Sequence, residues 1–356
     1  MKRYSEVVLN GHPDKFCDLI SDRFIRELYK SDKEGYAQIE VSVWSDQIFL
    51  TGGIATRHKL PFSSSEIIVS VGEEIGYSAE NHIDVRKYKI HDLICCINED
   101  PRKWTNFVND QSIVIGYAGY DAKTKFLPPE HFLCWYFREH LIHAIENGIL
   151  KKQGPDGKIL VVMNEDNSGW QVNTILITMQ QTEKKSFIDF TDEVHLVIQK
   201  AYLTLQNIDQ RWVSEWKVIK VMINPNGPLL NGGSDGDNGQ TGRKLAMDYY
   251  GPRIPIGGGA MYGKDLSHID RIGAINTRNF ALEMVMNGAK ESMVKVCYAP
   301  GINEPLSIDI MSDKRPSLNA EEFFNFTGMK RRLDIEYLNY KLDNIAGFYN
   351  INTIIL

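Results

Sequence analysis

The chain has 356 residues, of which 43% are hydrophobic and 24% are charged, and its formal net charge is −6. This composition is typical of a folded globular protein, and the length is sufficient for more than one domain. No apolar run is long enough to span a bilayer and no basic stripe is visible, so neither a membrane nor a nucleic acid is expected as a partner. The charged N-terminus does not resemble a signal peptide, and we therefore expect a cytoplasmic protein.

The cysteines are odd in number and form no CxxC pair. There are 5 of them: Cys17, Cys95, Cys96, Cys134 and Cys297. This pattern favours free, buried thiols over disulfide bonds or a structural zinc site.

Apolar residues at helical spacing predict a first helix from Pro13 to Leu28, with His12 just before it. Alternation over 38–44 and 47–51 predicts a hairpin with one polar face, and Glu40 lies on that face. A capped helix is predicted over 63–75. The remaining predictions are helices over 131–146, 191–205, 242–249 and 269–287, and strands over 158–163, 172–179, 217–223 and 293–298.

This order of strands and helices favours an α+β fold, with mixed sheets covered by helices on one face. Weak composition changes suggest an N-terminal domain over 1–100, a central domain over 101–212 and a C-terminal domain over 213–356. These boundaries are approximate, and the domains need not be continuous in sequence.

The first chemical motif is Gly-His-Pro-Asp-Lys, residues 11–15, at a predicted helix start. Backbone N–H groups there attract anions, Asp14 can bind Mg²⁺, and His12 and Lys15 can contact phosphate oxygens. Because acids also cap ordinary helices, this motif alone does not decide between a ligand site and a simple cap.

The second motif is a long glycine- and aspartate-rich loop over 224–241, followed by Arg243 and Lys244. Glycines permit close approach of the backbone to a ligand, and loops of this length in compact domains tend to be functional. The two cations at the start of the next helix suit a phosphate. A solvated surface loop is the alternative.

The third motif, Gly-Gly-Gly-Ala-Met-Tyr-Gly-Lys-Asp over 257–265, contains most of a Walker A sequence. The required Ser or Thr is replaced by Asp265 and no clear parallel strand precedes it, which excludes a P-loop NTPase. Glycine backbone together with Lys264 still suits a polyphosphate. Asp270 opens the next helix, as a metal ligand or as a helix-capping acid. The three motifs together predict a site for a polyphosphate with Mg²⁺.

In their order and spacing, these motifs closely resemble those of the S-adenosylmethionine synthetase family. The family signatures correspond here to Gly11–Lys15, to Gly236-Asp237 with Thr241–Lys244, and to Gly257–Asp265, where Met261 and Tyr262 are substituted. The resemblance implies three similar α+β domains about a pseudo-threefold axis. It also implies a homodimer or dimer of dimers with active sites between subunits. The implied reaction joins L-methionine to ATP and releases pyrophosphate and phosphate.

The resemblance further implies roles for individual residues. His12 matches a catalytic histidine, and Lys158, Arg243, Lys244 and Lys264 match ligands of ATP or its triphosphate. Further ATP contacts correspond to Asp156, Asp237 and Ala260, and Asp237 also matches a methionine contact. Mg²⁺ ligands correspond to Asp14 and Asp270, a K⁺ ligand to Glu40 and an adenosine-site acid to Asp110.

The chain departs from the family around methionine and adenine. Ile54 replaces a Glu that binds the methionine amine, Leu229 replaces an aromatic residue that stacks on adenine, and His268 replaces a Lys near the methionine carboxylate. The family's gating loop, expected over 98–107, is shortened, and the tail over 348–356 is short of the usual pattern. With an ordinary pKa, His268 would make the KM for methionine rise from about pH 6 towards about pH 8.

Three functions are therefore considered. The first is an active but divergent synthetase. The second is a catalytically weak regulatory paralogue that binds ATP or triphosphate, as the substitutions at Ile54, Leu229 and His268 suggest. The third is a related nucleotide transferase with another acceptor. Retention of the complete polyphosphate motif set favours the synthetase.

Overall fold

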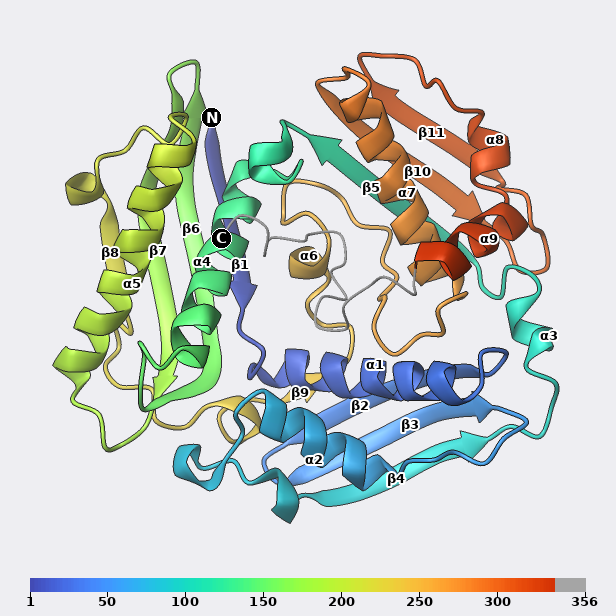
Figure 1. The fold of residues 1–356 in the computed structure, drawn as a ribbon, viewed down its shortest axis with the longest axis horizontal. Coiled ribbons are helices and arrows are strands. Elements are labelled where there is room, and N and C mark those ends of the chain that lie inside the picture. The colour runs from blue at the N-terminus through green and yellow to red at the C-terminus, as the bar shows by residue number, and fades with distance from the viewer. Residues whose placement is uncertain (337–356) are drawn as a thin grey trace.

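The computed structural model describes residues 1–336 and contains three β-sheets, each covered on one face by a pair of helices. Figure 1 shows the sheets arranged around the centre of the molecule, where the short helix α6 lies. This is the expected α+β architecture of three similar units. The tail over 348–356 lies outside the described residues.

The first sheet has the strand order β4-β3-β2-β9. Helices α1 and α2 cover one face, and β3 pairs with β4 in parallel while the other pairs are antiparallel. The bounds are β2 Tyr36–Trp44, β3 Gln47–Ala55, β4 Lys89–Cys96, β9 Gly239–Gln240, α1 Pro13–Ser31 and α2 Ser64–Glu74.

The second sheet has the order β1-β6-β7-β8, with α4 and α5 on one face. Here β7 and β8 are parallel and the other pairs antiparallel. The bounds are β1 Lys2–Val8, β6 Gln153–Asp166, β7 Gly169–Gln181, β8 Lys220–Ile223, α4 Pro129–Glu146 and α5 Phe187–Ile208.

The third sheet has the order β11-β10-β5, and both its pairs are antiparallel. Helix α7 packs on β5 and β10, and α9 packs on α7. The bounds are β5 Ser112–Gly119, β10 Glu291–Tyr298, β11 Ser307–Ser312, α7 Ile269–Met286 and α9 Phe326–Glu336. The short helices are α3 Arg102–Thr105, α6 Leu245–Asp248 and α8 Ala320–Phe323.

Each sheet combines a hairpin with a strand from a distant part of the chain. β9 joins the β2–β3 hairpin, β1 joins β6–β7, and β5 joins β10–β11. No sheet is therefore continuous in sequence, and the boundaries suggested near 100 and 212 stay a prediction.

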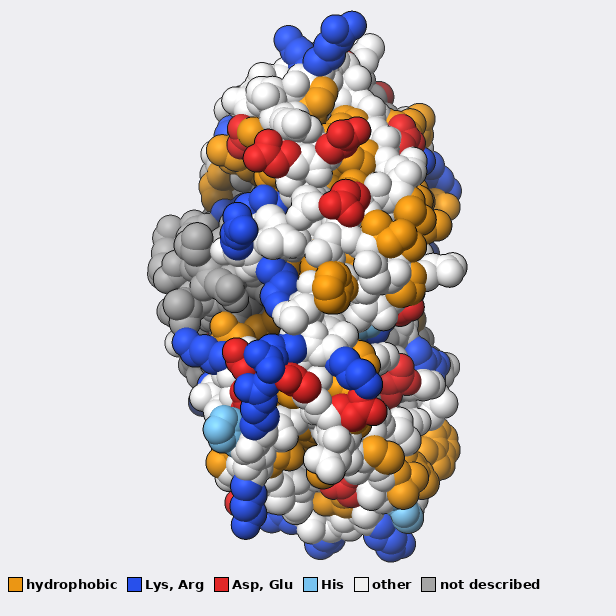
Figure 2. Space-filling model, turned by 90° about the vertical axis from the view of Figure 1, so that its right-hand side faces the viewer, with side chains coloured by type: hydrophobic (Ala, Val, Ile, Leu, Met, Phe, Trp, Pro, Cys, Tyr) orange, Lys and Arg blue, Asp and Glu red, His pale blue; other side chains and the backbone are white. Residues whose placement is uncertain are grey.

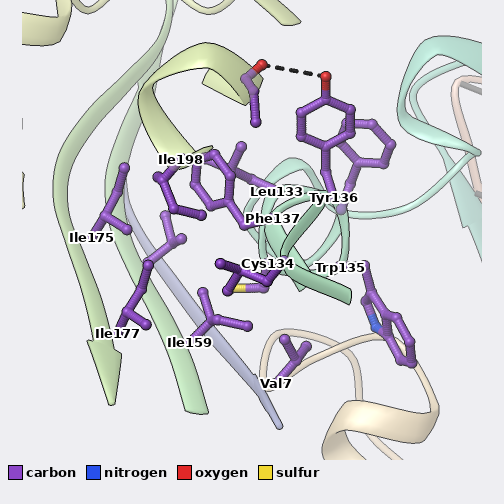
Figure 3. Close-up of a cluster of buried hydrophobic side chains, with 14 of the residues drawn as sticks. Val7, Leu133, Cys134, Trp135, Tyr136, Phe137, Ile159, Ile175, Ile177 and Ile198 are labelled. Carbon is purple, nitrogen blue, oxygen red and sulfur yellow. Dashed lines mark hydrogen bonds between the residues drawn. The ribbon is translucent and has the colours of Figure 1, made fainter. Parts of the chain in front are cut away.

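The core of the second sheet illustrates the packing (Figure 3). Leu133, Cys134 and Phe137 on α4 point towards Ile159 on β6 and Ile177 on β7, and all five are fully buried. Trp135 points away from this group. Helix α4 is thus apolar on more than one side, because both the sheet and neighbouring loops cover it.

The strongly periodic segments are confirmed as helices and strands, including the capping box at Ser63. Strands β1, β4, β5, β9 and β11 were not predicted. The expectation of buried thiols holds for Cys17 and Cys134 but is wrong for Cys95 and Cys96, which are exposed on the edge strand β4.

The surface carries charges of both signs. On the face shown in Figure 2, Lys and Arg side chains are interspersed with Asp and Glu side chains. Within residues 1–336, no helix combines the length and the apolar character needed to cross a membrane.

Candidate active site

The N-terminus of α1 places His12 and Asp14 side by side. His12 is the N-cap residue, Pro13 begins the helix, and the His12 Nδ1 accepts a hydrogen bond from the Asp14 backbone N–H at 3.2 Å. Both side chains are at most 2% exposed. The cap holds the imidazole rigidly at the helix start, where N–H groups point outward.

Burial, reinforced by the charges of Lys244 and Lys158, lowers the pKa of His12 to about 3. The imidazole is therefore neutral at neutral pH. Because Nδ1 accepts the cap hydrogen bond, the hydrogen of the neutral ring lies on Nε2. His12 thus offers a neutral N–H donor.

Asp14 joins α1 to the glycine-rich loop. Its Oδ1 accepts the backbone N–H of Gln240 at 2.9 Å, and its Oδ2 is paired with the Lys244 ammonium. Arg243 lies on the same carboxylate, with Nε 3.5 Å from Oδ1. Burial would raise the pKa of Asp14, but the Lys244 and Gln240 hydrogen bonds outweigh it and hold that pKa below its usual value.

The Pro155–Lys158 segment packs against the start of α1. A Cβ on Gly11 would lie 2.4 Å from the Pro155 carbonyl carbon, so only glycine permits this approach. Asp156 accepts the Gly233 backbone N–H at 2.8 Å, and burial raises its pKa to about 6. Lys158 follows Asp156 by two residues, is exposed, and pairs with Val8 of β1.

These residues, with the exposed Asp237, form one group that we call the His12 cluster: His12, Asp14, Asp156, Lys158, Asp237, Arg243 and Lys244. Its members come from three segments distant in sequence. Lys158 and Lys244 lie close enough to His12 to lower its pKa, and Asp237 lies close enough to Asp156 to raise its pKa.

The N-terminus of α7 carries a second group, which we call the Asp270 cluster. His268 caps this helix with its Nδ1 3.2 Å from the Asp270 backbone nitrogen, as His12 does in α1. Asp270 accepts a hydrogen bond from Ser112 at 2.5 Å and is paired with the Lys264 ammonium. Asp110 lies 3.9 Å from the His268 Nε2.

The expectation of an ordinary pKa for His268 is wrong. The side chain is 3% exposed, and burial with the nearby Lys264 charge lowers its pKa to about 4. His268 is neutral from pH 6 to pH 8, so it provides no reason for the KM of methionine to change over that range. The sequence pattern correctly placed His268 at the start of a helix but could not indicate its burial, and its role at methionine stays a prediction.

Two carboxylates in these clusters suit a divalent cation. Asp14 and Asp270 are each fixed by a neutral donor on one oxygen and paired with a lysine on the other. Oxygen atoms of Asp110 and Asp270 and a ring nitrogen of His268 also lie within 4.8 Å of one another. Among these atoms, the carboxylate oxygens are the hard ligands that fit Mg²⁺.

The two clusters meet through glycine contacts. A Cβ on Gly242 would lie 2.9 Å from the Ala260 Cβ, and one on Gly259 would lie 2.4 Å from the Asp270 carboxyl carbon. Ala260, in the segment that carries Lys264, therefore lies next to the segment that carries Lys244.

Other predicted positions lie apart. Glu40 is exposed on the face of its sheet opposite to α1, since its neighbours Ile39 and Val41 pack in the α1 core. Ile54 is buried in the same core, and Leu229 is half-buried with its carbonyl bonded to Gln181. The Glu40 carboxylate and the His12 cluster are thus on different sides of one sheet.

The segment expected to correspond to a gating loop, 98–107, contains the short helix α3. Arg57 binds the Asp100 carboxylate through both of its oxygens, and Trp104 stacks on Tyr36 with ring centres 5.5 Å apart. These contacts attach the segment to the first sheet.

Three features of the two clusters and their surroundings were not singled out from the sequence. They are Ser112, the backbone N–H of Gln240, and the carboxylates of Asp18 and Asp248 that pair with Lys15. Ser112 is the first residue of the unpredicted strand β5, and Gln240 contributes a backbone donor, so neither has a sequence signal. Lys15 and Asp18 have the i,i+3 spacing of a helical ion pair, which is a signal that was available.

Comparisons with known proteins identify related sequences over most of the chain. Models of the N-terminal, central and C-terminal domains of S-adenosylmethionine synthetase match residues 2–98, 106–229 and 231–353. An S-adenosylmethionine synthase of Acholeplasma laidlawii is 32% identical over 85% of this chain and 80% of its own length. One of Mycoplasma capricolum is 31% identical over 93% and 88%.

A solved structure is also similar in fold. It is described as an unusual S-adenosylmethionine synthetase from Campylobacter jejuni, with a TM-score of 0.83, 23% identity and coverage of 98% of this chain and 94% of that one. The sequence similarity spans all three domains of the synthetase at above 30% identity, and this chain belongs to the S-adenosylmethionine synthetase family.

Proposed function

We propose that this protein synthesises S-adenosylmethionine from ATP and L-methionine, releasing pyrophosphate and phosphate. The observation that carries the proposal is the convergence of the signature segments on the N-termini of α1 and α7. There they bring together Lys158, Arg243, Lys244 and Lys264 with two candidate metal carboxylates. A regulatory paralogue is not favoured, because family membership extends over the whole length of the enzyme.

The chemistry requires alignment more than proton transfer. The methionine sulfur is a neutral thioether, so its attack on C5′ of ATP needs no general base. The barrier falls when the reactants are aligned and when charge developing on the leaving triphosphate oxygen is stabilised. The neutral Nε2–H of His12 is suited to donate a hydrogen bond to that oxygen.

The cationic side chains bind the triphosphate in this proposal. Arg243, Lys158 and Lys244 approach it from the His12 cluster, and Lys264 from the Asp270 cluster. Asp156, Asp237 and Ala260 contribute the remaining ATP contacts. Asp156 already holds the glycine-rich loop through Gly233, which fixes the loop that carries Asp237.

Asp14 and Asp270 would hold Mg²⁺, which neutralises phosphate charge when bound. Lys244 and Lys264 are paired with these two carboxylates. When Mg²⁺ binds the carboxylates in their place, the two lysine side chains can turn to the phosphate. Glu40 is proposed as a K⁺ ligand, and Asp110 as a contact to the adenosine. His268 is proposed as a neutral donor to the methionine carboxylate, with Asp237 facing the amine.

We further propose that the protein acts as a homodimer, or as a dimer of dimers, with sites between subunits. The outer face of the first sheet exposes Trp44 (56%), Phe49 (41%) and Leu93 (62%) on three adjacent strands, on the same face as Glu40. Exposed apolar faces of this kind usually mark interfaces. Light scattering that gives a monomer mass would contradict this proposal. The cytoplasmic location stays a prediction.

One assay tests the function. The protein is mixed with ATP, L-methionine, Mg²⁺ and K⁺, and S-adenosylmethionine is measured together with phosphate and pyrophosphate. We expect all three products. Hydrolysis of tripolyphosphate without any sulfonium product at high methionine would instead support the regulatory paralogue, and product with another acceptor would support a related transferase.

A further inference from the structure

A buried lysine next to Asp14 joins the signature segments. Lys15, in the first turn of α1, is 3% exposed. Its ammonium donates to Asp18 at 2.9 Å and to Asp248 at 2.5 Å, and it lies 3.9 Å from the centre of the Tyr262 ring. Asp18, Asp248 and Tyr262 are themselves at most 5% exposed. Such an ammonium is not available to a substrate.

The partners of Lys15 belong to the segments that carry the phosphate-binding candidates. Asp18 accepts the Gly242 backbone N–H at 2.8 Å, directly before Arg243 and Lys244. Asp248 ends the short helix α6 and donates its backbone N–H to the Lys244 carbonyl. The Arg243-Lys244 pair is thus fixed on both sides through Lys15.

Tyr262 extends the connection to the Asp270 cluster. It precedes Lys264 by two residues, and the intervening Gly263 accepts the Ile39 backbone N–H at 2.7 Å. The cation above the Tyr262 ring therefore holds the Lys264 segment against α1. The Lys15 ammonium is thus one contact shared by three segments that are distant in sequence.

The Lys15 position requires a cation, because its ammonium lies between two buried carboxylates. Two carboxylates buried side by side repel each other. Burial, together with the Asp248 charge, raises the pKa of Asp18 to about 7, and burial raises the pKa of Asp248, although Lys15 between them opposes both shifts. Asp18 and Asp248 outweigh the effect of burial on Lys15 and raise the pKa of its ammonium. An apolar side chain at this position would leave the carboxylates unpaired.

We propose that Lys15 is a positioning residue, which fixes Arg243 and Lys244 over Asp14 through Asp18 and Asp248 without contacting substrate. This inference rests on the proposed function, because it assigns these cations to the triphosphate.

The test is a double-mutant cycle that combines Asp248→Asn with Arg243→Ala. Asp248→Asn keeps the side-chain size and leaves Lys15 paired with Asp18. The measurement is the Kd of inorganic tripolyphosphate with Mg²⁺ by calorimetry, which does not require the synthetic reaction. We expect Asp248→Asn to weaken binding about 10-fold in the native background and less than about 2-fold with Arg243→Ala, since residues that act through one another are non-additive.

Steady-state kinetics supply a second readout. Asp248→Asn should lower kcat for S-adenosylmethionine formation while leaving the KM for methionine nearly unchanged. Asp209→Asn, which removes a buried carboxylate paired with Arg211 far from the site, controls for loss of a buried charge and should change neither quantity.

A second variant covers the case in which Asp248→Asn does not fold. Tyr262→Leu retains every charge and removes only the ring, and we expect its loss of tripolyphosphate affinity to shrink with Lys264→Ala. If the fold-changes in tripolyphosphate Kd for the two single variants multiply to that of the double variant in either cycle, the proposal is overturned. A wild-type protein that binds tripolyphosphate but forms no S-adenosylmethionine would instead contradict the proposed function alone.

Discussion

His12 and His268 occupy equivalent positions at the starts of two helices. In both, Nδ1 lies 3.2 Å from the backbone nitrogen two residues later, and that residue is an aspartate paired with a lysine. The sequence located both, because each His-x-Asp precedes a helical apolar pattern. It could not indicate that both imidazoles are buried and neutral, since burial depends on segments distant in sequence.

Removal of a candidate charge partner is expected to impair turnover. Asp14→Asn or Lys264→Ala should lower kcat at least about 100-fold, the scale observed when one charge partner of a transition state is lost. Asn still accepts the Gln240 N–H, so the fold should survive. Steady-state kinetics with circular dichroism check both expectations.

Lys30→Ala provides the matched control for this experiment. Lys30 is exposed in the last turn of the same helix and pairs only with Glu27 among the ion pairs of the described residues. Its removal should leave kcat unchanged. Near-normal turnover of Asp14→Asn would mean that Asp14 is a helix cap and not a ligand.

At the scale of elements, local periodicity identified helices and long hairpins but not the strands that complete the sheets. β4 is exposed at most positions and therefore lacks alternation, and β5 contains glycines at both Gly116 and Gly119. The pairing of β1 with β6 joins residues from 150 to 162 positions apart. No local pattern indicates such a pairing, since it depends on how whole units pack.

The junction between α1 and the Pro155–Lys158 segment can be tested with Gly11→Ala. The added Cβ would lie 2.4 Å from the Pro155 carbonyl carbon, so one segment must move. We expect a loss of about 1–3 kcal/mol in the free energy of unfolding, as for other overpacked sites. The KM for ATP should rise, because Lys158 moves away from His12.

Gly328→Ala is the control for this substitution. Gly328 lies in α9, and a Cβ there would meet the Glu322 carbonyl oxygen at an ordinary 3.5 Å. Alanine in a helix should stabilise the protein by about 0.5–1 kcal/mol without changing KM. Equal denaturation midpoints for Gly11→Ala and the wild type would show that the two segments are not tightly packed.

At the scale of the molecule, each unit contains a strand from a distant part of the chain, which links the three units to one another. His131 at the start of α4 lies at such a link: its ring bonds Ser5 of β1 at 2.9 Å and the Met247 carbonyl of α6 at 3.1 Å. The Trp135 indole nitrogen lies 3.1 Å from the same Nε2, which accepts this N–H only in the tautomer that does not donate to Met247. Full burial lowers the pKa of His131 to about 3.

This buried histidine should make the protein sensitive to acid. The unfolded chain binds a proton at His131 below about pH 6.5 and the folded chain does not, so stability falls as pH drops from there towards about 3. One such group contributes at most about 1.4 kcal/mol per pH unit. The neighbouring Glu130 acts in the opposite direction, because burial raises its pKa.

His131→Gln should therefore reduce the slope of unfolding free energy against pH between pH 6.5 and pH 5, measured by urea denaturation. His131→Gln can also lower stability at every pH, but only the dependence of the unfolding free energy on pH reports the titration. The control is His58→Gln at an exposed position, which should leave that dependence unchanged. If His131→Gln and the wild type share one slope, the acid sensitivity of the fold arises elsewhere and the interior at this link is accessible to protons.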